Sequence, residues 1–161
     1  MNKIFKKEDL KRKLDTLRGQ GKKIAFTNGC FDILHVGHVR YLREAKKTAD
    51  ILVLALNSDA SVRSIKGEKR PLVAEDERAE VLAALEYIDF ITIFDELTPL
   101  ELIKYLKPDV LIKGGDWPEE KVVGRQEVKS WGGRVTIIPE VEGKSTTHIV
   151  DKINTLYLSD Q

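Results

Sequence analysis

The amino-acid sequence predicts a doubly wound α/β fold, in which a parallel five-stranded sheet carries helices on both faces. Apolar runs and amphipathic stretches alternate along the whole chain, which is typical of this class. The runs are uninterrupted, as expected of strands that are buried on both faces of a parallel sheet. The predicted strands lie within residues 22–28 (KKIAFTN), 50–57 (DILVLALN), 89–94 (DFITIF), 109–115 (DVLIKGG) and 134–140 (RVTIIPE).

Three of the stretches between or before these runs place apolar residues at helical spacing. The first helix is closed by Gly19 and Gly21, and Thr98-Pro99 predicts a cap residue followed by proline at the first position of a later helix. The three apolar faces consist of Leu10, Leu14 and Leu17; of Val39, Leu42, Ala45 and Ala49; and of Leu97, Leu100, Ile103 and Leu106.

The length of 161 residues suits one domain, and the chain contains no repeat or linker. We expect an N-terminal helix within 1–20 and an α/β core over 22–158. The net charge of +1 gives no general reason to expect nucleic acid or an anionic membrane as partner. Cys30 is the only cysteine, and neither a signal peptide nor a membrane-spanning stretch is evident. The expected localisation is therefore cytoplasmic.

The departures from these regular patterns cluster at the predicted carboxyl ends of strands. TNGCFD follows the first strand, NSD the second, and KGGDW the fourth. Parallel strands end at one edge of the sheet, where ligands usually bind. If the winding reverses beside the first strand, the ends of the first and fourth strands border one crevice.

Two of the three histidines, His35 and His38, stand three residues apart where a helix is predicted to begin. The free backbone N–H groups and the dipole of that helix favour an anion, and Gly29 permits a sharp turn or a close approach. Both imidazoles can then donate to phosphate oxygens. Taken singly, these side chains have plainer interpretations: Asp32 as a turn residue and Cys30 as a small buried hydrophobe. Two histidines without a third clear ligand make a poor metal site.

Two further stretches offer groups for an anion. In EGKSTTHIVDKI, the residues Ser145, Thr146 and Thr147 precede an amphipathic pattern, where they can cap a helix, bind phosphate, or do both. In SIKGEKRPLVAEDER, the cations Lys66, Lys69 and Arg70 are expected in a surface loop. A solvated charge run is the default interpretation of that loop.

GCFDILHVGH resembles the H-x-G-H signature of the cytidylyltransferase-like nucleotidyltransferases. That resemblance implies a Rossmann-like fold and transfer of a nucleoside monophosphate from ATP or CTP to an acceptor, with release of pyrophosphate. Together with LNSDASVRSIKG, LIKGGDW and GKSTTHIVDKI, the match covers almost the whole chain. In this detail it is most similar to the heptose 1-phosphate adenylyltransferases, which make ADP-heptose for bacterial lipopolysaccharide. The implied reactants are ATP and D-glycero-D-manno-heptose 1-phosphate, and a homodimer is expected.

The resemblance also implies roles for individual residues. It makes His35, His38 and Lys66 catalytic, with Arg70 as a weaker candidate for a phosphate contact. Magnesium is expected on the ATP phosphates, and no metal-binding side chains are expected. Besides the two histidines, the implied nucleotide-binding residues are Asn28, Gly29, Cys30, Phe31, Asp32, Arg78, Lys113, Gly114, Gly115, Asp116, Ser145, Thr146 and Thr147.

The C-terminal motif departs from a related pattern. Glycerol-phosphate cytidylyltransferases often have R-T-E-G-I-S-T-T, whereas this chain has EVEGKSTT, with Glu140 in place of the arginine and Lys144 as its possible substitute. Two alternatives stay open: a cytidylyltransferase for a small phosphorylated alcohol such as glycerol 3-phosphate, and a nucleotide-binding module without catalysis. A dehydrogenase is disfavoured, because no G-x-G-x-x-G follows the first strand.

Overall fold

The computed structural model describes residues 2–115, 117–139 and 143–157. Five strands form one sheet in the order β3-β2-β1-β4-β5, and every neighbouring pair is parallel. The predicted doubly wound α/β fold is therefore confirmed. The strands are β1 (Ile24–Gly29), β2 (Ile51–Asn57), β3 (Phe90–Phe94), β4 (Val110–Gly114) and β5 (Arg134–Ile138).

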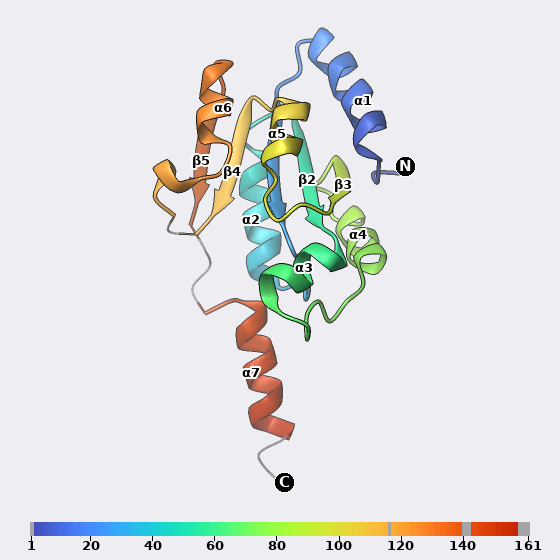
Figure 1. Ribbon diagram of the computed structural model, residues 1–161, viewed down its shortest axis with the longest axis vertical. Coiled ribbons are helices and arrows are strands. Elements are labelled where there is room, and N and C mark those ends of the chain that lie inside the picture. The colour runs from blue at the N-terminus through green and yellow to red at the C-terminus, as the bar shows by residue number, and fades with distance from the viewer. Residues whose placement is uncertain (1, 116, 140–142, 158–161) are drawn as a thin grey trace.

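Helices cover both faces of the sheet (Figure 1). One face packs against α1, α5 and α6, and the other packs against α2 and α4. The helices are α1 (Lys7–Gly19), α2 (Val36–Lys46), α3 (Asp59–Lys66), α4 (Glu75–Ala83), α5 (Leu100–Leu106), the 3₁₀ turn η1 (Glu119–Lys121), α6 (Arg125–Ser130) and α7 (Thr146–Tyr157).

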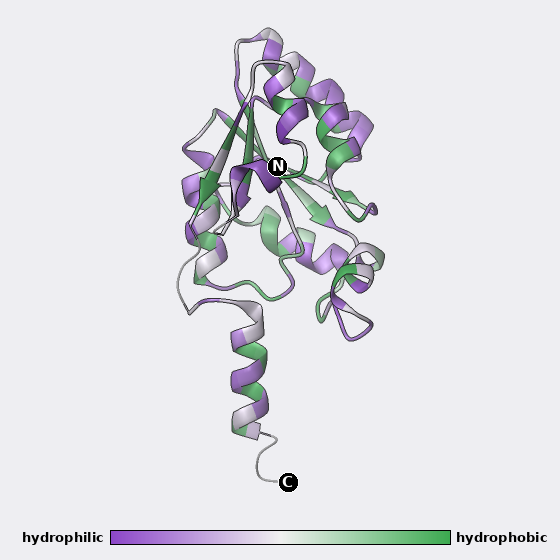
Figure 2. Ribbon diagram, turned by 60° about the vertical axis from the view of Figure 1, so that its left-hand side comes forward, coloured by the Kyte–Doolittle hydropathy of each residue, from purple (hydrophilic) through white to green (hydrophobic). Residues whose placement is uncertain are grey.

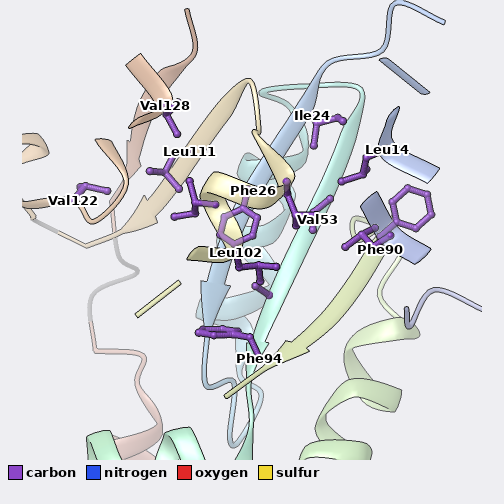
Figure 3. Packing of buried hydrophobic residues seen from close by; sticks show 14 residues of the cluster. Leu14, Ile24, Phe26, Val53, Phe90, Phe94, Leu102, Leu111, Val122 and Val128 are labelled. Atoms are coloured by element: carbon purple, nitrogen blue, oxygen red, sulfur yellow. The ribbon is translucent and has the colours of Figure 1, made fainter. Parts of the chain in front are cut away.

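The apolar core lies in two layers, one on each side of the sheet, because successive strand side chains point to opposite faces. Ile24 and Phe26 enter the layer that Figure 3 shows, together with Leu14 of α1 and Leu102 of α5. Ala25 enters the other layer. Uninterrupted apolar runs are required for this arrangement, and each fully buried large side chain contributes about 1.5–3 kcal/mol.

Two details of the helix predictions differ from the structure. Helix α5 begins at Leu100, so Pro99 occupies the N-cap position rather than the first helical position, and it makes no side-chain cap bond. Leu97 is 64% exposed and does not belong to the buried face of that helix. The bends before α5 carry Leu97 outward, whereas Ile103 and Leu106 are buried as predicted.

The winding reverses at β1, which pairs with β2 on one side and with β4 on the other. The carboxyl ends of β1 and β4 are therefore neighbours, as predicted, and they open on the crevice of a doubly wound sheet. Helix α7 extends away from the body of the molecule in both Figure 1 and Figure 2. None of its residues is buried. Within the described ranges, no helix is long and apolar enough to cross a membrane.

Candidate active site

A cleft of about 680 Å³ lies at this edge of the sheet. The ends of β1, β2, β4 and α3 contribute to it, as do the starts of α2 and α7. Among the predicted site residues, Arg78 and Gly115 do not line the cleft, and Asp116 lies outside the described residues. The cleft is lined by the predicted residues Asn28, Gly29, Cys30, Phe31, Asp32, His35, His38, Lys66, Lys113, Gly114, Ser145, Thr146 and Thr147.

His35 is the N-cap residue of α2. Its Nδ1 accepts a hydrogen bond from the backbone N–H of Gly37 at 3.1 Å. In the neutral ring the proton then lies on Nε2, which becomes a donor. A Cβ on residue 37 would lie 2.8 Å from Nδ1 and Cε1 of His35. The glycine of the H-x-G-H motif is therefore required for the position of this imidazole.

His38 stacks on His35 with ring centroids 3.8 Å apart, and the ring of Phe31 lies 5.0 Å away. Burial, helped by the charge of His35, lowers the pKa of His38 from 6.5 to about 4, so the ring is neutral near pH 7. Its Nδ1 is buried and has no hydrogen-bond partner among the described residues. A buried polar atom of this kind is normally paired, so it is available to a ligand group.

Phe31 itself has a left-handed backbone with φ +46°, which is uncommon for a residue with a side chain. Its ring lies over Gly29, where a Cβ would come within 2.7 Å of Cε2. The sequence predicted Gly29 as a sharp turn or a close approach to a ligand. In the structure, the close approach is made by the phenyl ring of Phe31.

The cleft is strongly cationic, although the chain as a whole carries only +1. Lys66 is the last residue of α3, which corrects its expected place in a loop. Burial, with a contribution from Lys66, lowers the pKa of Lys113. The one described carboxylate that lines the cleft is Asp32. The described cations that line it are Lys66, Arg70, Lys113, Lys121 and Lys144.

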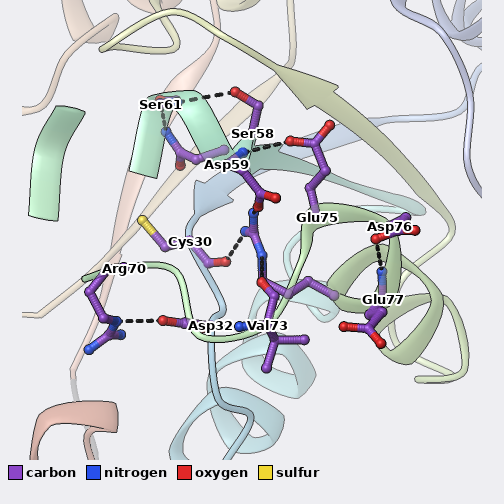
Figure 4. A network of polar contacts seen from close by, with 12 residues as sticks. Cys30, Asp32, Ser58, Asp59, Ser61, Arg70, Val73, Glu75, Asp76 and Glu77 are labelled. Carbon is purple, nitrogen blue, oxygen red and sulfur yellow. Dashed lines mark hydrogen bonds and ion pairs between the residues drawn. The ribbon is translucent and has the colours of Figure 1, made fainter. Parts of the chain in front are cut away.

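The Asp32 side chain is almost fully buried and bonds to the loop that follows α3 (Figure 4). It accepts hydrogen bonds from the backbone N–H groups of Leu72 at 2.8 Å and of Val73 at 3.0 Å, and from Nε of Arg70. Asp32 lines the cleft, and its proximity to a nucleotide stays a prediction. However, the carboxylate and Arg70 are bonded to each other, and together they fix the loop that follows α3.

The geometry does not support a direct contact between Arg78 and the nucleotide. The Arg78 side chain is 0% exposed and does not reach the cleft. Its guanidinium donates to the carbonyl of Val73 at 2.9 Å, to the carbonyl of Cys30 at 2.5 Å and to Oδ1 of Asp59 at 2.8 Å. It therefore lies beneath the site and not within it.

Tyr41 lines the cleft, although the sequence did not single it out. Its hydroxyl shares a 2.6 Å hydrogen bond with that of Thr27, and burial raises its pKa to about 12. A Cβ on Gly114 would lie 3.2 Å from the Tyr41 ring, so this glycine makes room for the tyrosine. Gly115, with φ +94°, donates its N–H to Ile138 and joins β4 to β5. Tyr41 stands three residues after His38, which places the two side chains on one side of the helix. This spacing could have predicted Tyr41 as a residue of the site.

At the start of α7, the predicted cap is confirmed, because Oγ of Ser145 accepts the N–H of His148 at 3.0 Å. The Thr146 hydroxyl donates to the carbonyl of Ile33 at 3.2 Å and thereby joins α7 to the loop after β1. Phosphate binding by these hydroxyls stays a prediction.

Sequence reasoning also missed an apolar rim on the cleft. It consists of large hydrophobic side chains that are exposed and yet share one cavity: Ile65, Leu97, Trp117 and Val123. Trp117 was visible as the end of the KGGDW stretch. The described residues contain no group of three histidine, cysteine, aspartate or glutamate side chains that could hold a metal ion.

This chain is similar to known proteins in sequence and in fold. The bifunctional protein HldE of Geobacter metallireducens is 61% identical over 89% of this chain, and that of Syntrophotalea carbinolica is 55% identical over 97%. The matches cover 29% and 32% of those proteins, so the chain spans about a third of their length.

A solved structure agrees with the fold. The lipopolysaccharide core biosynthesis protein from Thermoplasma volcanium GSS1 matches with a TM-score of 0.63 and 28% identity, over 75% of this chain and 98% of that one. The family model described as cytidylyltransferase-like matches residues 26–156, which include both histidines, the cationic cleft and the start of α7. By this match over most of its length, the chain belongs to the cytidylyltransferase-like family.

Proposed function

We propose that this chain is an adenylyltransferase that transfers AMP from ATP to D-glycero-D-manno-heptose 1-phosphate, giving ADP-heptose and pyrophosphate. The observation that carries the proposal is the pair of stacked histidines at the start of α2, in a cleft lined by five cations of the described ranges. One of these histidines has a buried nitrogen that no described residue pairs. Family membership supports nucleotidyl transfer. The sequence resemblance described above supports the heptose acceptor, as does the similarity to a lipopolysaccharide core biosynthesis protein.

In this reaction an oxygen of the acceptor phosphate forms a bond to the α-phosphorus of ATP. The bond from that phosphorus to the bridging oxygen breaks, and its electron pair leaves with pyrophosphate. A phosphate monoester is already an anion near neutral pH, so no strong general base is required. Catalysis then depends on alignment and on neutralising charge. His35 and His38 donate to the phosphates, and Lys66, Lys113 and Lys144 offset the triphosphate charge.

Magnesium accompanies ATP in this proposal and is held mainly by phosphate oxygens and water. The described residues offer no ligand set of their own, since the carboxylate of Asp32 is already bonded to Arg70 and two backbone N–H groups. The ion supplies neutralising charge to the phosphates. The histidines and lysines named above position the phosphates in this proposal.

The proposal includes a homodimer in the cytoplasm, with no nucleic-acid or membrane partner. The resemblance to the heptose 1-phosphate adenylyltransferases supports the homodimer. Light scattering of the purified chain measures its mass directly, and a monomer at working concentration contradicts this part of the proposal.

The function is tested with a panel of two nucleotides and two acceptors, in which pyrophosphate release is measured. We expect turnover with ATP and heptose 1-phosphate and little with CTP or with glycerol 3-phosphate. Turnover with CTP alone identifies a cytidylyltransferase instead. Binding of ATP without pyrophosphate release from any acceptor identifies a non-catalytic nucleotide-binding module.

A further inference from the structure

Arg78 is the largest fully buried side chain in the described part of the protein, and its guanidinium carries a charge. It lies on α4, whose other buried residues are Ala79 and Leu82. A buried ion loses most of its hydration, and several good hydrogen bonds are needed to offset that loss. The partners of Arg78 therefore show what it holds.

Each partner of Arg78 belongs to a different segment beside the cleft. Cys30 lies in the loop between β1 and α2, which carries the predicted phosphate-binding backbone. Val73 lies in the loop between α3 and α4. Asp59 is the first residue of α3, and Lys66 is the last. One rigid fork of donors thus joins three segments, whose bonded residues lie 5, 19 and 48 residues before Arg78 in the sequence.

Asp32 joins two of the same segments, because it lies in the loop after β1 and accepts a hydrogen bond from Val73 (Figure 4). The two groups meet at Val73, whose N–H donates to Asp32 and whose carbonyl accepts from Arg78. Arg78 also bonds to Cys30, which is two residues before Asp32. The contacts form a closed ring through Cys30, Asp32, Val73 and Arg78, so a shift of either loop breaks a hydrogen bond of Asp32 or of Arg78.

We propose that Arg78 is a positioning residue for nucleotidyl transfer, which sets the loop after β1 and the Lys66 end of α3 relative to each other without touching substrate. This inference rests on the proposed function. Arg78 does not line the cleft that is proposed to bind the nucleotide. Its loss therefore lowers kcat through misalignment and leaves the KM for ATP nearly unchanged.

The test compares Arg78→Lys with a matched control, Arg18→Lys. Lysine keeps the charge at residue 78, but one ammonium cannot reproduce the three-way fork. Arg18 also bonds two carbonyls and a carboxylate, those of Leu106, Lys107 and Asp15, and it joins α1 to the end of α5, before β4. Each variant is first checked for folding and thermal midpoint, and all rates are measured well below the lower midpoint.

For Arg78→Lys we expect kcat to fall by about 10- to 100-fold while the KM for ATP stays within about threefold, because small misplacements have large effects on aligned phosphoryl transfer. Arg18→Lys should lower the thermal midpoint and leave kcat within about twofold, as expected of a stabilising contact alone. A kcat for Arg78→Lys within about twofold of wild type overturns the proposal, whatever its effect on stability.

Amide hydrogen exchange gives a readout that does not depend on turnover. Faster exchange at 28–33 and 70–74 is expected in Arg78→Lys and not in Arg18→Lys, and unchanged exchange there overturns the proposal. If the wild-type chain turns over no acceptor, the proposed function fails, and exchange alone then decides whether Arg78 orders these loops.

If Arg78→Lys does not fold, Asp59→Ala is measured in its place. This change removes one of the three acceptors at a side chain that is 26% exposed. A fall in kcat of about fivefold or more, with the KM for ATP within about threefold, supports the proposal. A smaller fall in kcat overturns it.

Discussion

Helices α2 and α7 both begin at the cleft, and both offer groups that suit phosphate, but they are held in place very differently. The start of α2 is enclosed: His35 is fixed by the Gly37 N–H, His38 stacks on His35, and Leu42 and Ala45 anchor the helix in the core. The start of α7 is joined to the body through the hydroxyl of Thr146, and none of the residues of that helix is buried.

The half of the site at the start of α2 (the α2 half) is therefore preorganised by the fold. The half at the start of α7 (the α7 half) is not. Groups fixed before substrate binds need no reorganisation during the reaction, so the α2 half suits stabilisation of the transition state. A helix of 12 residues with no buried side chain is marginal by itself. The α7 half therefore suits substrate binding, with order supplied by the ligand.

The largest effect is expected from substitutions in the α2 half of the site. Replacing His38 or His35 by alanine removes a preorganised donor, and kcat for pyrophosphate release should fall by about 100-fold or more. The control is His148→Ala, since the third histidine is exposed and does not line the cleft. Near-normal rates in both His35→Ala and His38→Ala, with folding confirmed, would refute their assigned role.

Gly37→Ala tests whether preorganisation itself matters. The new methyl group would lie 2.8 Å from the His35 ring, so the imidazole must turn and lose its bond to the residue 37 N–H. We expect kcat/KM to fall by about tenfold, which corresponds to about 1.4 kcal/mol. Gly19→Ala is the matched control, because a Cβ there meets nothing within 4 Å. Equal activity of the two variants contradicts the idea that His35 must be held.

The same contrast explains what the sequence predicted well. A strand that is buried on both faces must be apolar throughout, so the five runs located all five strands. Gly29, His35 and Gly37 were found because a strand end followed by a helix start is a local pattern. The crevice between β1 and β4 followed from general rules of winding.

What the sequence did not reveal depends on contacts between distant residues. Arg78 stands in the charged stretch AEDER, where burial leaves no local sign, and its partner Cys30 is 48 residues away. Thr146 bonds to a carbonyl 113 residues away, and Gly114 is needed for the ring of Tyr41. Residue type at a loop does not show whether a glycine faces a ligand or a neighbouring side chain.

Ser145→Ala probes the α7 half. Loss of this cap weakens the helix start by about 1 kcal/mol, and we expect the KM for ATP to rise about fivefold while the thermal midpoint stays unchanged. Ser58→Ala is the comparison, because Ser58 caps α3 in the same way but is buried, so its loss should lower the midpoint by about 2–4 °C. If Ser145→Ala lowers the midpoint as much as Ser58→Ala and leaves the KM for ATP unaltered, α7 is packed in solution and the contrast fails.

The last expected effect is on stability and not on turnover, and it concerns the α2 half alone. The folded protein keeps His38 neutral down to a pH of about 4, because burial and His35 lower its pKa, whereas the unfolded chain takes up this proton near 6.5. The unfolded state therefore binds more protons between these values, and the stability that is fully present above pH 6.5 is lost as the pH falls toward about 4.

Replacing His38 by glutamine removes this titration. The thermal midpoint of wild type should fall more steeply than that of His38→Gln as the pH is lowered from 7 to about 4.5, by about 2–4 °C for each ~1 kcal/mol involved. Both proteins contain the same carboxylates, so those groups contribute equally to the two curves. Parallel curves would mean that His38 is not kept neutral by its surroundings, and that the α2 half is less enclosed than its stacked rings indicate.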